Sequence, residues 1–89
     1  MKTVQKPLLI IAPNYRQAKI FMFNMDLRAQ PYYQIALRPQ DLLGRRLDTW
    51  EVWWLDRMWP CDTHEEIEFM LYMKRLAKSR GADLHRWWT

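Results

Sequence analysis

The chain has 89 residues, of which 49% are hydrophobic and 15% aromatic, and six of them are tryptophan. A chain of this length forms one domain, residues 1–89, and so much large apolar surface excludes a disordered protein. Fourteen Lys and Arg residues against ten Asp and Glu residues give a net charge of +4, which permits an acidic partner without requiring one.

The compartment is indicated by two features of the sequence. No apolar run approaches the roughly 20 residues that a membrane span needs, and the first residues lack the pattern of a signal peptide. Cys61 is the single cysteine, which excludes an internal disulfide and is typical of proteins in a reducing compartment. We therefore expect a cytoplasmic protein without a membrane partner.

The first half of the chain alternates between strand and helix patterns. Residues 4–12 end in a continuous apolar run, which is typical of a strand buried on both faces. Asn14 is a good N-cap, and apolar residues then recur at helical spacing, which predicts a helix over residues 15–27. A run of aromatic and aliphatic residues predicts a second strand over residues 32–37.

The middle of the chain predicts a short helical turn and a third strand. Residues 38–44 begin with a proline near the start and end on Gly44, the pattern of one helical turn. Residues 49–55 alternate so that both faces of a strand carry large apolar side chains. Glu51 in this strand indicates an edge position.

The last helix has the clearest start signal in the sequence. Thr63 and Glu66 form a capping box, and Gly81 is the natural residue to end the helix. The apolar sector of this helix is wider than a single stripe facing a sheet. The tryptophan-rich tail over residues 83–89 either covers an edge of the sheet or contacts a partner.

This order of elements predicts an α/β fold with parallel strands and right-handed crossovers. We expect a minimal, Rossmann-like domain with a three-stranded, mostly parallel sheet in the order 2-1-3 and two main helices. The first helix and the connection over residues 38–48 should then lie on opposite faces of the sheet.

Two segments resemble the core of RecA-like helicase and terminase ATPases. Residues 8–18, Leu-Leu-Ile-Ile-Ala-Pro-Asn-Tyr-Arg-Gln-Ala, are similar to the strand-to-helix step that follows the phosphate loop in those motors. Residues 52–56, Val-Trp-Trp-Leu-Asp, resemble their second motif, in which a strand ends on a magnesium-binding Asp. The chain also looks like small actinobacteriophage proteins of unassigned role, over residues 8–58. The resemblance implies a phage-encoded protein with a fragment of a nucleotide-binding fold.

The sequence, however, lacks the motifs that carry the nucleotide chemistry of these motors. With two glycines, the chain contains neither the phosphate loop Gly-x-x-x-x-Gly-Lys nor the dinucleotide fingerprint Gly-x-Gly-x-x-Gly. Asp56 is followed by Arg57, where those motors place a catalytic Glu. We therefore expect no nucleotide cofactor and no nucleotide hydrolysis.

A cysteine and a histidine raise two further kinds of site. Cys61 and His64 are half of a zinc site, but His85 is the only other histidine, and structural zinc sites need four good ligands. Cys61 near a helix start, with His64 as its base, lacks a third residue to orient that base. We expect no metal and no enzymatic activity. An enzyme using Cys61 or Asp56 would instead need a deep polar pocket at the strand ends.

The aromatic surplus predicts a protein-binding surface. Six tryptophans exceed what so small a core encloses, and Trp, Tyr and Arg dominate protein–protein contacts. The expected function is a non-enzymatic accessory or host-interacting factor, whose partner is a host protein or a second copy forming a homodimer. The candidate partner-binding residues are Trp59, Met58, Arg57, Trp87, Trp88, Arg86, Tyr15, Arg45 and Arg46.

The second hypothesis is a sequence-tolerant nucleic-acid-binding protein. Its phosphate contacts would come from four arginines, and its base-stacking contacts from tryptophans outside the regular elements. Their spacing matches no known nucleic-acid-binding module, so a protein partner is the preferred reading. The residues involved would be Arg45, Arg46, Arg57, Arg86, Trp59, Trp87 and Trp88.

Overall fold

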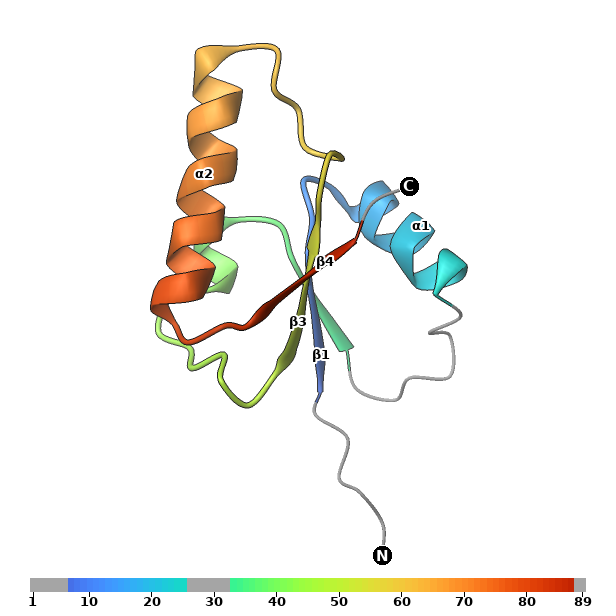
Figure 1. Cartoon of the computed structure of the whole chain (residues 1–89), viewed down its shortest axis with the longest axis vertical. Helices are drawn as coiled ribbons and strands as arrows, with labels where there is room; N and C mark the ends of the chain where they lie inside the picture. Colours follow the sequence, from blue (N-terminus) through green and yellow to red (C-terminus); the bar gives the residue numbers. More distant parts are fainter. Residues whose placement is uncertain (1–6, 26–32, 88–89) are drawn as a thin grey trace, which may run out of the picture.

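A computed structural model describes residues 7–25 and 33–87, which form one parallel sheet with a helix on each face (Figure 1). A short 3-10 turn lies beside the longer helix. In the described ranges, no helix combines the length and the apolar character needed to cross a membrane. The elements are β1 (Leu8–Ile11), α1 (Tyr15–Asn24), β2 (Tyr33–Ala36), η2 (Pro39–Asp41), β3 (Glu51–Leu55), α2 (His64–Ser79) and β4 (Leu84–Trp87).

The sheet has the order β2-β1-β3-β4, with every neighbouring pair parallel. The α/β class and the order of the first three strands are thereby confirmed, but the prediction of only three strands was wrong. Residues 84–87 of the tail form the fourth strand, and the amide of Asp56 donates to the carbonyl of Trp87 at 2.7 Å. Trp88 lies outside the described residues. β3 is therefore an internal strand, and the edge position inferred from Glu51 was also wrong.

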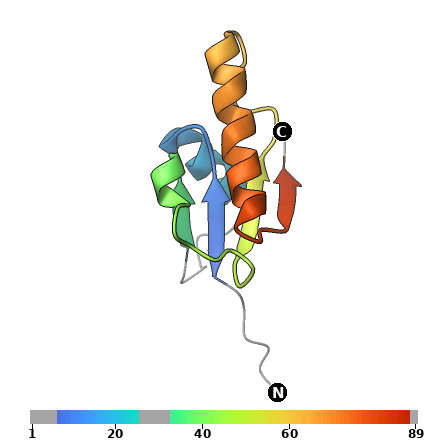
Figure 2. The same cartoon turned by 90° about the vertical axis from the view of Figure 1, so that its left-hand side faces the viewer.

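The two faces of the sheet are covered by different elements, as expected. Beneath α1, the core includes Phe21 and Met22 of that helix. On the opposite face, Met73 and Ala77 of α2 pack with Leu42 from the connection after β2. Figure 2 shows α2 and the connection together on this second side of the sheet. All four residues of β1 are buried, because both faces and both edges of this strand are covered.

Both helices begin where the sequence predicts. Asn14 Oδ1 accepts from the amide of Gln17 at 2.9 Å, which satisfies a free amide of the first turn of α1. At the start of α2, Thr63 Oγ1 accepts from the amide of Glu66 at 3.1 Å, and Glu66 Oε1 accepts from the amide of Thr63 at 3.0 Å. Gly81 follows the C-cap of α2 with φ of 90°, a conformation that favours glycine.

The ends of the elements differ from the predicted ones by a few residues. α1 ends at Asn24, whose side-chain amide donates to the carbonyl of Ile20 at 2.8 Å and competes with continued helix. The helix end predicted at Leu27, the strand residues predicted at positions 4–6 and the one predicted at Tyr32 lie outside the described residues. β3 begins at Glu51 instead of residue 49, after a turn in which the amide of Trp50 donates to the carbonyl of Leu47.

Replacing the fully buried Met73 by alanine should lower the free energy of unfolding by about 2–5 kcal/mol, because it leaves a cavity between α2 and the sheet. Leu71→Ala, on the exposed side of the same helix, should change it by less than about 0.5 kcal/mol. Urea denaturation of the two variants measures this difference. Equal losses would contradict the burial pattern of α2.

Candidate functional site

The carboxyl edge of the sheet is where a ligand-binding site is expected in this fold. The segments that follow β1 and β3 leave this edge toward opposite faces, one to α1 and the other to α2. Ligands bind at such a switch point in many open α/β sheets. The residues that line it come from the turn before α1 and from residues 56–60.

Trp59 occupies this edge as a core residue. Its side chain is 5% exposed and stacks on Trp54, with ring centres 4.7 Å apart and an interplanar angle of 11°. The ring of Phe69, from α2, lies beside the Trp59 ring, with ring centres 6.2 Å apart. The prediction that Trp59 is an exposed partner contact was therefore wrong. The chain turns at Arg57, where φ is 64°, and the segment that follows lays the indole against the α2 side of the sheet.

Two open hollows flank Trp59. Pro13, Pro60 and Phe69 line the first, and Asn14, Gln17 and Arg57 are among the residues that line the second. Gln17 Oε1 and Trp59 Nε1 are buried and have no hydrogen-bond partner among the described residues. Neither hollow is lined by Cys61 or Asp56, the residues that an enzyme at this edge would use.

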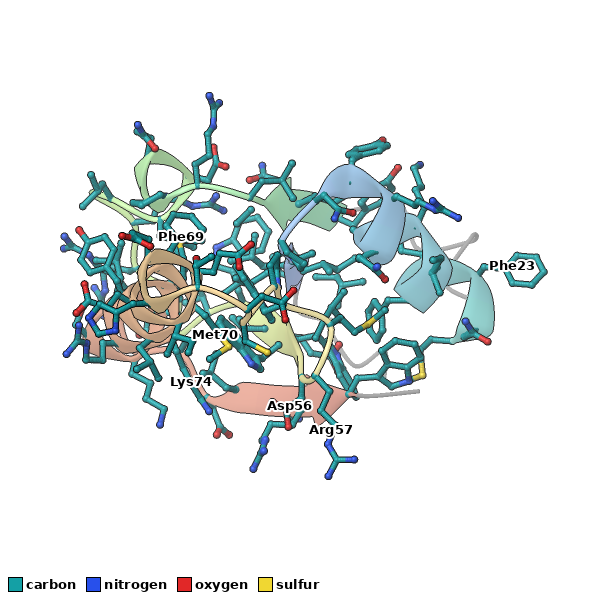
Figure 3. All side chains as sticks on the ribbon, turned by 90° about the horizontal axis from the view of Figure 1, so that it is seen from above. Phe23, Asp56, Arg57, Phe69, Met70 and Lys74 are labelled. Atoms are coloured by element: carbon teal, nitrogen blue, oxygen red, sulfur yellow. The ribbon has the colours of Figure 1, made fainter. Side chains whose placement is uncertain are left out.

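Asp56 is bound by an arginine of the neighbouring strand. Its carboxylate lies 2.5 Å from Arg86 Nη2, and its side chain is 19% exposed. Figure 3 shows Asp56 and Arg57 beside β4. The charge of Asp56 is matched by that of Arg86. Within residues 7–25 and 33–87, no three His, Cys, Asp or Glu side chains are grouped closely enough to hold a metal ion.

Met58 and Trp87 of the candidate set also contribute to the core. Both are half-buried and pack against the cluster beneath α1. The Trp87 ring meets Phe21 edge-on, with ring centres 5.1 Å apart. The Trp53 ring also packs on Phe21, with ring centres 5.4 Å apart. Much of the aromatic surplus is thus used in holding the two helices to the sheet.

The four arginines of the nucleic-acid hypothesis lie at opposite ends of β3. Arg45 lies 4.6 Å from the centre of the Trp50 ring, and Arg46 pairs with Asp48 at 3.1 Å, both before the strand begins. Arg57 and Arg86 lie at its carboxyl end, about 16 Å away for a strand of five residues. The structure does not bring these cations together with the tryptophans in one groove.

Tyr15 is exposed, as a partner contact requires, but its ring is already covered by a cation. Its side chain is 53% exposed, and Lys19 Nζ lies 5.0 Å from the ring centre and 5.9 Å from that of Tyr33. The hydrogen bond to Tyr15, together with the charges of both tyrosines, raises the pKa of Lys19. Tyr15 and Lys19 therefore form a small surface unit with β2.

A further exposed apolar surface, absent from the predicted site residues, lies on α2. Four large apolar side chains there are 38–45% exposed, and Figure 2 shows no other described element over the helix. Met70, by contrast, points between α2 and the sheet (Figure 3). The wide apolar sector of this helix was the signal in the sequence. We call these residues the α2 strip; they are Ile67, Phe69, Leu71 and Tyr72.

Trp59→Ala should lower the free energy of unfolding by about 3–5 kcal/mol, because it removes the ring that stacks on Trp54. Trp59→Phe should cost much less, since it keeps an aromatic ring and removes a buried N–H without a partner. Chemical denaturation followed by circular dichroism compares the two. A fully stable Trp59→Ala protein would show that this ring is not part of the core.

Comparison of the chain with protein-family models, with curated proteins and with solved structures finds no match.

Proposed function

We propose that this chain is a non-enzymatic protein-binding domain and that the α2 strip is its binding surface. The observation that carries the proposal is the exposure of four large apolar side chains on one helix. Exposed apolar area gathered on one element is typical of a partner site. The function expected from the composition is retained, while the residues assigned to it change.

The composition of this surface supports the proposal. Large apolar side chains and the exposed charges of Glu65, Glu68, Arg75 and Lys78 lie side by side on the exposed part of α2. Protein–protein interfaces combine apolar contacts with polar and charged ones. Covering the exposed half of each large side chain contributes about 1 kcal/mol, so the four together favour association by several kcal/mol.

The positions of four tryptophans in the core also support this surface. Trp54 and Trp59 pack beneath α2, while Trp53 and Trp87 pack beneath α1. Trp54 and Trp59 cannot contact a partner without opening the core, and Trp53 and Trp87 are half-buried. Four of the large apolar side chains that remain exposed belong to α2.

Leu71→Ser should abolish the capture of specific partners by the tagged protein, because it places a hydroxyl at the centre of the α2 strip. Leu43→Ser is the matched control: Leu43 is 49% exposed and Leu71 is 45% exposed, but Leu43 lies in the connection after η2. Quantitative mass spectrometry after affinity capture from an actinobacterial lysate, the background suggested by the phage resemblance, compares the two. Light scattering of the purified proteins tests self-association in parallel.

Two results would contradict the proposed function. One is a wild-type protein that captures nothing specific and stays monomeric. The other is a set of partners that Leu71→Ser and Leu43→Ser retain equally, which would place the binding surface elsewhere.

A further inference from the structure

We propose that the partner of the α2 strip is a second copy of this chain, with the two α2 helices packed antiparallel about a two-fold axis. The axis passes between Leu71 and Tyr72. This inference rests on the proposed function and names the occupant of the surface. It is carried by the order of charges along α2.

The exposed charges of α2 are divided by sign between its two halves. Glu65 and Glu68 are exposed in the first half, and Arg75 and Lys78 are exposed in the second. Spacings of three and seven residues place these four side chains on one side of a helix, together with Leu71. This side is opposite Met73 and the other residues that α2 buries against the sheet.

An antiparallel copy aligns these charges as two pairs of opposite sign. When Glu68 faces Arg75 of the second copy, the same alignment places Glu65 opposite Lys78, because both pairs are centred between Leu71 and Tyr72. The midpoint of α2 falls at the same place. Two-fold symmetry repeats the Glu68–Arg75 pair, so the centre of the contact would hold two ion pairs, with Glu65 and Lys78 of opposite sign at each end. A parallel arrangement would place like charges opposite each other.

The charges concerned are not neutralised within the chain. Among the described residues, Glu65, Arg75 and Lys78 have no ion-pair partner, and Glu68 has His64, at 3.0 Å, whose charge depends on protonation. Glu68 and Arg75 are two helical turns apart, about 10 Å along the axis, so they cannot pair with each other. The charges lie on the solvent side of the helix, where a second copy reaches them.

Two apolar residues of the α2 strip, Leu71 and Tyr72, fall at the centre of the same contact. Both lie next to the two-fold axis, so they contact Leu71 and Tyr72 of the second copy. Ile67 and Phe69 lie on either side of the charged stripe, where they would close the margins of the contact. One helix face per subunit is at the small end of specific interfaces, and we expect a dimer that dissociates on dilution into the micromolar range.

Reversing a single charge provides the test. Glu68→Arg and Arg75→Glu should each weaken self-association at least about tenfold, because each change turns two ion pairs of the symmetric contact into two like-charge contacts. Mixing the two variants in equal amounts should restore dimers near the wild-type level. In the mixed dimer, each arginine at position 68 or 75 faces a glutamate of the other copy. Sedimentation velocity over a concentration series measures all three.

The matched control is Arg16→Glu, which makes the same reversal on α1 and should leave self-association unchanged. Circular dichroism confirms that each variant is folded. A wild-type protein that remains monomeric throughout the series would overturn the inference, as would a dimer that survives both reversals or single variants that mixing fails to restore. A monomer that still captures partners through Leu71 would overturn the second copy as occupant and leave the proposed function standing.

Discussion

The complete burial of β1 is the constraint on which the rest of the structure depends. Its side chains project to both faces, and none of its residues is more than 2% exposed. A strand of this kind requires a strand at each edge and a covering layer on each face. β2 and β3 supply the edges, α1 covers one face, and α2 with the connection after η2 covers the other.

The aromatic residues complete this arrangement. A four-residue strand offers little area, so large rings are needed to fill the space between the sheet and each helix. The stack of Trp54 and Trp59 fills one side, and the contacts of Phe21 with Trp53 and Trp87 fill the other. The outer side of α2 stays exposed, because no further layer lies beyond that helix in the described part of the chain.

The parts of the fold with strong local signals could be predicted from the sequence. The apolar run of β1 and the caps at Asn14 and Thr63 are encoded within a few residues, so strand and helix starts follow from them. β4 has no such signal, since a short segment becomes an edge strand only when β3 offers a free edge. The burial of Trp59 depends on the turn at Arg57. The exposure of the α2 strip depends on which side of the helix packs against the sheet. The turn and the docking of the helix have no local signature, although the wide apolar sector of α2 is visible in the sequence.

The all-parallel pairing of the sheet has a consequence for how the chain folds. No two neighbouring strands are joined by a hairpin, and β1 pairs with strands that follow it across a helix or a long connection. Each pairing therefore requires the closure of a long loop before any sheet hydrogen bond forms. Only the helices can begin to form through local contacts. β1 becomes stable after both β2 and β3 have paired with it. Folding should consequently be slow for so short a chain and strongly cooperative, with the sheet appearing as a unit.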